Sequence, residues 1–278
     1  HDALPIYNVY VGSQSGRNGG GNQSVFVGTQ AGYNNQFLGN ENTFVGNLSG
    51  FTNSSGARNT FVGSSAGFSN LTASGNSAFG RNALATNSTG IQNSAFGDNS
   101  LLVNTGGSNS AFGSNALAGN TTGGSNSAFG NYAMSISSTG SENSAFGNGA
   151  MGGLTSGGFN IAIGASAGNN LTSGSQNIII GYAINAPGAT LSNQLNIGNL
   201  IFSQGINGTG STLSTGNIGI GTTTPATRLQ VFGDARVGNA GTNGCLQRFD
   251  GAALTGTCTS DQNLKKDIVY LDNILGKV

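Results

Sequence analysis

The feature that most constrains the fold of this chain is a short motif, Asn-Ser-Ala-Phe-Gly, that recurs at an almost constant spacing. Five near-identical copies end at Gly80, Gly97, Gly113, Gly130 and Gly147. Weaker copies, such as residues 42–46 and 177–181, extend the series in both directions. The closing glycines run from Gly12 to Gly198 and lie 16 to 18 residues apart, most often 17. A period held over most of a chain predicts a stacked array in which each repeat forms one coil.

The residues before each closing glycine predict a short strand. Counting the glycine as position zero, position −1 is Val, Phe or Ile, and position −2 is Phe in three early repeats and Ala in the later ones. Side chains alternate across a strand, so two consecutive apolar positions predict a strand that is buried on both faces. One face would fill the inside of the coil, and a second chain is the simplest cover for the other.

A second run of small residues starts three positions after the glycine, for example at Ala66, Ala83 and Ala116, and predicts a second strand in each coil. The following position is Gly where Phe stands at −2, and Leu or Met where Phe stands at −1. This exchange predicts one close-packed interior that is filled in two ways at constant volume. We therefore expect an all-β fold, a parallel β-roll or β-solenoid with 17-residue coils of two strands.

Asparagine occupies position −4 of nine consecutive repeats, from Asn42 to Asn177. Coils in such an array are about 4.8 Å apart, a spacing at which stacked amides can bond to one another. The sequence therefore predicts an asparagine ladder along the array. The Gly, Asn, Ser and Thr residues between the apolar positions are typical of turns.

Composition excludes several classes of protein. The chain has 50 glycines, no tryptophan and only 6% charged residues, which suits a disordered chain except for the strict period. A net charge of zero offers nothing to nucleic acid, and no apolar run is long enough to span a membrane. A single histidine cannot build a catalytic triad or a histidine metal cluster, and Glu41 and Glu142 lie about six coils apart. We expect no enzyme activity, no metal and no cofactor.

A rise in charge density near residues 200–228 predicts a domain boundary. We expect an N-terminal strand at 1–11 that could contact another subunit, a repeat array at 12–198, a β neck at 199–259 and a helical segment at 260–278. Cys245 and Cys258 lie in the predicted neck. A disulfide between them would place the protein outside the reducing cytosol, whereas two buried thiols are the alternative.

The repeat unit, Asn-Ser-x-Phe/Ile-Gly followed by a small-residue run, resembles the head repeats of trimeric autotransporter adhesins, whose heads are trimers of left-handed parallel β-rolls. The resemblance covers about residues 8–198. The period of 17 departs from the shorter one that is typical of those heads. The resemblance implies a homotrimer, exposure at the cell surface and adhesion.

The C-terminal part carries a second resemblance. Residues 217–225 resemble the linker before the intramolecular chaperone of bacterial and phage tail fibres, and residues 260–268 resemble the opening of the self-cleaving chaperone of endosialidases and tail spikes. The resemblance implies that Ser260 and Lys265 form a dyad that cuts the chain just before the serine. From the residues alone, Ser260 can equally cap a helix and Lys265 can be a solvated charge. Only 19 residues follow the expected cut, so we do not expect this chain to cleave itself.

These observations predict a homotrimeric, extracellular or cell-surface fibre or filament subunit with a structural or adhesive role. Its expected partners are further copies of the chain, including a head-to-tail filament, and a surface receptor or glycan. The alternative is a phage or injection-system tail fibre that binds a host receptor. Self-cleavage before Ser260 is expected only of a longer product.

Overall fold

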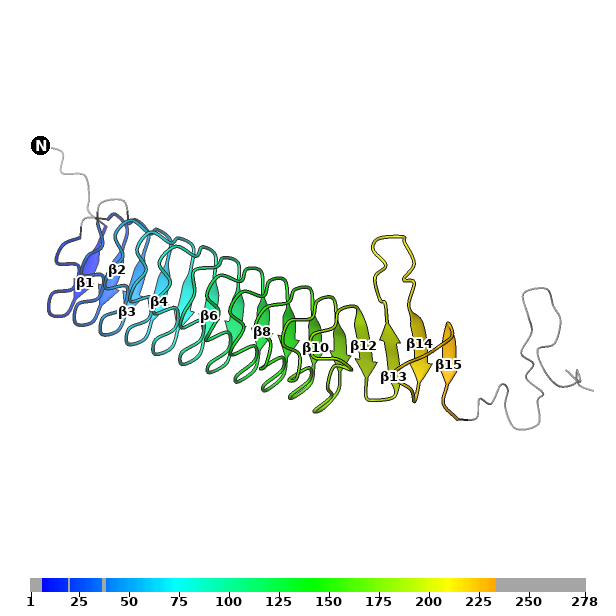
Figure 1. Cartoon of the computed structure of the whole chain (residues 1–278). Coiled ribbons are helices and arrows are strands. Elements are labelled where there is room, and N and C mark those ends of the chain that lie inside the picture. Colours follow the sequence, from blue (N-terminus) through cyan, green and yellow to red (C-terminus); the bar gives the residue numbers. More distant parts are fainter. Residues whose placement is uncertain (1–6, 20, 37–38, 234–278) are drawn as a thin grey trace, which may run out of the picture. The chain divides into compact units, whose positions relative to one another are not determined.

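The computed structural model describes residues 7–19, 21–36 and 39–233, and no helix occurs among them. The chain divides into two compact units, His1–Gln230 and Val231–Val278, and only the start of the second is described. A single sheet holds fifteen strands in sequence order (Figure 1). The strands are β1 (Val9–Val11), β2 (Val25–Val27), β3 (Thr43–Val45), β4 (Thr60–Val62), β5 (Ser77–Phe79), β6 (Ser94–Phe96), β7 (Ser110–Phe112), β8 (Ser127–Phe129), β9 (Ser144–Phe146), β10 (Ile161–Ile163), β11 (Ile178–Ile180), β12 (Gln194–Ile197), β13 (Ile201–Gln204), β14 (Asn217–Ile220) and β15 (Leu229–Val231).

The strands β1 to β12 are parallel, and each pairs with the strand one coil further along the chain. Equivalent positions stand side by side, so that Phe79 pairs with Phe96. The predicted parallel β-solenoid with coils of about 17 residues is therefore confirmed. The residues Val9–Val11 of the expected N-terminal strand form β1 and pair with β2 of their own chain. The parallel array ends at β12, which pairs antiparallel with β13, and β13 pairs antiparallel with β14.

The prediction of two strands in each coil is wrong. The residues after each closing glycine form turns, because the backbone enters the left-handed region at positions +2 and +4. In the coil that begins at Gly80, Asn82 has φ of 57° and Leu84 has φ of 54°. In a strand, Ala83 and Leu84 would point to opposite faces, but in this turn both are fully buried. The small residues therefore mark a tight turn whose side chains face the interior.

The core is filled in the two ways that the sequence predicts. In the early coils Phe26, Phe44 and Phe61 are fully buried and stack face to face, with centroids 4.9 Å and 5.0 Å apart. A Cβ at position +4 of these coils, where glycine stands, would overlap the phenylalanine ring of the same coil. In the later coils position −2 shrinks to alanine, and a longer side chain at +4 takes the space. These side chains are Leu84, Leu101, Leu117, Met134 and Met151, all fully buried.

The asparagines at position −4 form the predicted ladder. The backbone N–H of Asn76 donates to Oδ1 of Asn59 at 2.9 Å, and Nδ2 of Asn76 donates to the carbonyl of Gly90 in the next coil at 3.0 Å. Each amide therefore bonds both to the coil before it and to the coil after it. Gln194 ends the ladder, since its backbone N–H donates to Oδ1 of Asn177 and its amide bonds to carbonyls of the last turn. These buried amides satisfy polar groups that stacking removes from water.

A second asparagine ladder runs through position +7 and was not predicted. It includes Asn53, Asn70, Asn87, Asn104 and Asn120, and Nδ2 of Asn120 donates to Oδ1 of Asn104 at 2.7 Å. The next coil has Ser137 at this position, and serine is too short to continue the ladder. As a result, Oδ1 of Asn120 and Oγ of Ser137 are buried without a hydrogen-bond partner. The ladder ends on a pair of unsatisfied polar atoms.

We expect Ser137→Asn to stabilise the protein by about 1 kcal/mol, because the new amide can donate to Oδ1 of Asn120 and extend the ladder. This corresponds to a rise in Tm of about 2–4 °C for a chain of this size. Thermal unfolding followed by circular dichroism measures the shift. Ser137→Ala is the matched control, since it removes the unpaired hydroxyl without completing the ladder. A Ser137→Asn protein that melts below both wild type and Ser137→Ala would contradict this account.

Candidate functional site

The outward surface of the parallel strands is the largest apolar feature of the described chain. We call it the outer strand face, and it comprises the residues at positions −3 and −1 of β1 to β12. Position −2 points into the core, so position −1 points outward. The residues at position −1 form one unbroken apolar column. It consists of Val11, Val27, Val45, Val62, Phe79, Phe96, Phe112, Phe129, Phe146, Ile163, Ile180 and Ile197.

Five phenylalanines form the centre of this column. Phe79, Phe96, Phe112, Phe129 and Phe146 stack ring on ring, with centroids 4.7 to 5.0 Å apart and interplanar angles of 4° to 8°. Phe146 is 43% exposed, as is Ile163 one coil further on. In one chain the rings cover one another but leave their edges in water. An apolar stripe that crosses twelve strands is more than the scattered exposed side chains of an ordinary surface.

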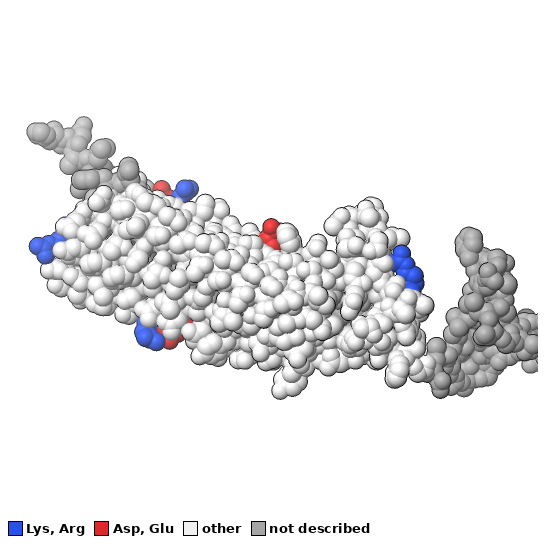
Figure 2. Space-filling model, viewed as in Figure 1, with Lys and Arg blue, Asp and Glu red and all other residues white. Residues whose placement is uncertain are grey.

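The outer strand face is also uncharged, since no strand from β1 to β12 contains a charged residue. Figure 2 shows the few charged side chains as isolated spots on a broad uncharged surface. One ion pair links neighbouring coils beside this face, between Arg81 Nη2 and Asp98 Oδ2 at 2.8 Å. Both of these side chains are well exposed, so the pair adds little stability. No charge would be buried if another apolar surface covered the face.

A second aromatic row lies outside the sheet, at position +5 of the early coils. Tyr33, Phe51 and Phe68 stack with centroids 5.1 Å and 5.2 Å apart, and the guanidinium of Arg17 lies 6.0 Å from the ring centre of Tyr33. At the first coil, Tyr10 stacks on Phe26 and covers the end of the core column. Partial burial raises the pKa of the Tyr10 hydroxyl above its usual value.

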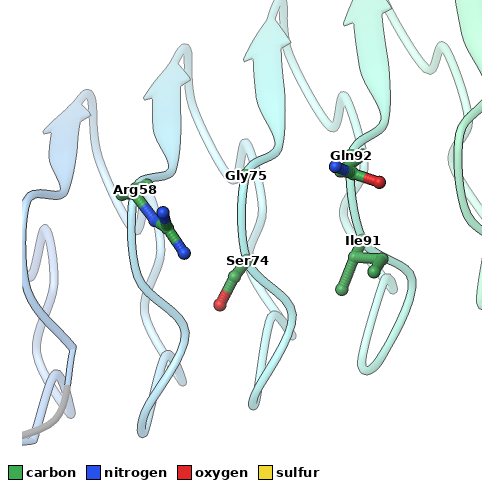
Figure 3. Close-up of a pocket in the computed structure, with 5 residues that line it drawn as sticks. All are labelled: Arg58, Ser74, Gly75, Ile91 and Gln92. Atoms are coloured by element: carbon green, nitrogen blue, oxygen red, sulfur yellow. The ribbon is translucent and has the colours of Figure 1, made fainter.

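A notch of about 330 Å³ opens on another side of the coils, and we define it by Arg58, Ser74, Gly75, Ile91 and Gln92. These residues come from three successive coils, at positions −6 and −5 before the strands β4, β5 and β6 (Figure 3). Arg58 forms one wall and Gln92 the other, with Ser74 and Gly75 on the coil between them. Ile91 lines the notch with an apolar side chain that is 50% exposed.

The notch was not predicted from the sequence. The signal for it was present, since the −5 positions align in the repeat and Gly75 is the one glycine in that column. Glycine is so common in this chain that an additional one does not stand out by composition. It stands out only when each column is compared along the array.

The candidate residues from the sequence, Ser260 and Lys265, lie outside the described residues, as do Cys245 and Cys258 and the expected helix at 260–278. Within the described ranges, no group of three or more His, Cys, Asp or Glu side chains is placed to hold a metal ion. Nor does this part of the chain contain a helix that is long and apolar enough to cross a membrane. The outer strand face and the notch are thus the surface features from which function can be argued.

Comparison of the chain with protein-family models, with curated proteins and with solved structures found no match.

Proposed function

We propose that this protein is a structural or adhesive subunit of an extracellular or cell-surface fibre, in which copies of the chain, three in the simplest assembly, associate through the outer strand face. The observation that carries the proposal is the unbroken apolar column at position −1, with its five stacked phenylalanines. Parallel sheets are normally covered on both faces, because their strands present apolar side chains on each side. In a single chain the coil covers only the inner face.

The distribution of charge supports association between identical copies. An isologous or cyclic assembly brings the same patch of each subunit together, and like charges on that patch would repel. The outer strand face has no charged residue to oppose such a contact. Eleven steps between twelve strands give the face a length of about 50 Å, which suits a long lateral contact along a fibre.

Several further apolar residues beyond the array support the same proposal. Leu213, Leu229 and Phe232 are 88%, 62% and 79% exposed, although each is large and apolar. They lie beyond the last parallel strand, in the segment between β13 and β14 or in and after β15. Contact with other copies would remove these side chains from water as well.

We expect the protein to have the mass of about three chains in solution, and Phe129→Asp combined with Phe146→Asp to reduce it to one chain. Two carboxylates on the outer strand face would have to be desolvated in the assembly, at a cost of several kcal/mol. In the single chain both positions are partly exposed, so the fold should persist. Light scattering measures the mass, and circular dichroism measures the fold.

Tyr132→Asp is the matched control. Tyr132 is 52% exposed and belongs to the coil that follows Phe129, but it lies outside the strand. Its replacement should leave the mass unchanged. A wild-type protein with the mass of one chain would contradict self-association, and so would a double variant that keeps the wild-type mass.

The alternative assignment, a tail fibre that binds a host receptor, shares the same assembly. It rests on the resemblance of residues 217–225 and 260–268 to tail-fibre segments. A search of the flanking gene for a virion-attachment domain separates this alternative from a cell-surface fibre.

A further inference from the structure

In a repeat protein the neighbouring coils show what each position requires, and the notch is formed by residues that depart from their columns. Arg58 and Gln92 flank Gly75 in column −5, with φ of 57° and 58°, while Gly75 has φ of 72°. Since residues with side chains adopt almost the same backbone in adjacent coils, the backbone does not require glycine here. A Cβ on Gly75 would meet only Gln92, with Cγ at 3.6 Å and the backbone N at 3.9 Å. The main effect of this glycine is to open the notch.

The other wall residues are also unusual. Ile91 stands in column −6, where its neighbours are Ala57, Ser74 and Gly107, and it is the one branched apolar side chain in that column. It is half exposed with no apolar side chain of the column beside it. These departures occur in successive coils and meet at one place, whereas drift in a repeat would scatter them.

Arg58 differs from the other arginines of the described chain. Arg81 pairs with Asp98, Arg17 lies over the ring of Tyr33, and Arg228 donates to two backbone carbonyls. The guanidinium of Arg58 has no ion pair or hydrogen bond to any described residue. It extends toward the coil that carries Gly75 (Figure 3), so its donors are available to a ligand in the notch.

We propose that the notch binds the ring of a carboxylate-bearing sugar, such as a hexuronic acid residue of a polysaccharide. The planar guanidinium of Arg58 presents paired donors that match a carboxylate. Ile91 offers an apolar surface to the C–H groups of the ring. Gln92 has a side-chain amide that can both donate and accept, and Oγ of Ser74, which accepts the N–H of Ala57 at 3.0 Å, keeps its own proton to donate. These groups suit the hydroxyls of the sugar.

The combination favours a sugar acid over an acidic peptide. A carboxylate alone needs only the arginine, whereas this notch adds an apolar wall and two neutral polar groups that a glutamate side chain would leave unused. Its volume of about 330 Å³ lies at the lower end of small-ligand sites and suits one ring of a longer chain. The inference rests on the proposed surface fibre for its source of ligand, but no notch residue belongs to the outer strand face.

The test is a titration of the full chain with methyl β-glucuronide, followed by saturation-transfer and chemical-shift NMR. We expect binding with a Kd of about 1 mM, since the site is shallow and exposed. Methyl β-glucoside, which lacks the carboxylate, should bind about tenfold more weakly. Arg58→Gln should have the same effect because it removes the charged fork. Gly75→Gln should abolish binding by filling the notch with a residue that this column accepts at Gln92.

Arg17→Gln is the matched control, because it removes another exposed arginine and should leave binding unchanged. No binding by wild-type protein, or equal binding by Gly75→Gln, would overturn the proposal. N-acetyl-glutamate amide that binds as tightly as the glucuronide would overturn the sugar and indicate an acidic peptide. The mass of each sample by light scattering keeps a failure of the notch distinct from a failure of self-association.

Discussion

Phe61→Ala is expected to destabilise the protein by about 3–5 kcal/mol, and the further change Gly67→Leu is expected to restore most of that loss. Phe61 is fully buried, so its removal leaves a cavity in the core. Leucine at position 67 would occupy the same space, as Leu84 does in the next coil. The backbone accepts it, because Gly67 has φ of 59° and Leu84 has φ of 54°.

Position 61 is the best place for this test because it lies at the boundary between the two kinds of core. Phe61 stacks on Phe44 on one side, while the next coil has Ala78 at the same position. The double variant therefore moves the boundary by one coil and breaks only one aromatic stack, at a cost of about 0.5–1.5 kcal/mol.

Gly67→Leu alone should destabilise by about 1–3 kcal/mol or more, because a Cβ at this position overlaps the Phe61 ring. Urea unfolding of the wild type, both single variants and the double variant gives the coupling energy of the pair. Additive losses would mean that the two positions do not fill the same space.

Gly113→Ala is expected to destabilise the array by at least about 3 kcal/mol. Gly113 has φ of 137°, a conformation that residues with a side chain rarely adopt. An added Cβ would also lie 2.5 Å from the carbonyl oxygen of Gly130 and 2.6 Å from its carbon. The closing glycine of one coil thus packs against the closing glycine of the next, and a methyl group would force the two coils apart.

Gly149→Asn is the control for this prediction. Gly149 also has a positive φ, 63°, but a Cβ there would meet only Oγ of Ser166 at 3.7 Å. Equivalent positions in earlier coils carry Asn82 and Asn99 with φ of 57° and 56°. The control should change stability by less than about 1 kcal/mol in the same unfolding experiment. A Gly113→Ala protein as stable as Gly149→Asn would show that the glycine column is not required for stacking.

The repeat made much of the fold predictable. The period gave the coil, the alternation at −1 and −2 gave the strand, and the exchange between Phe61 with Gly67 and Ala78 with Leu84 gave the two fillings of one core. The ladder at −4 was predictable because asparagine occupies that position almost without exception. Each of these inferences compares the same position in many coils, and a chance pattern would not persist through them.

The errors have physical causes. A run of small residues is compatible with both a strand and a tight turn, and only the backbone shows that Asn82 and Leu84 adopt positive φ. Leucine and methionine rarely do so, hence residue type argued against the turn. The second ladder was missed because it stops at Asn120, where Ser137 follows. The notch was missed because it consists of exceptions, and a search for repeats reads past exceptions.

The stacking of identical coils has a consequence for the gene. Coils contact only the coils beside them, and both asparagine ladders and the core continue across every junction in the same register. Recombination between the near-identical segments that encode these repeats would add or remove whole coils and leave the remaining contacts in place. Length can therefore change in steps of about 4.8 Å without a new fold. Insertions of any other size would shift a closing glycine out of its column, so the reading of the repeat by recombination and the packing of the protein select the same unit.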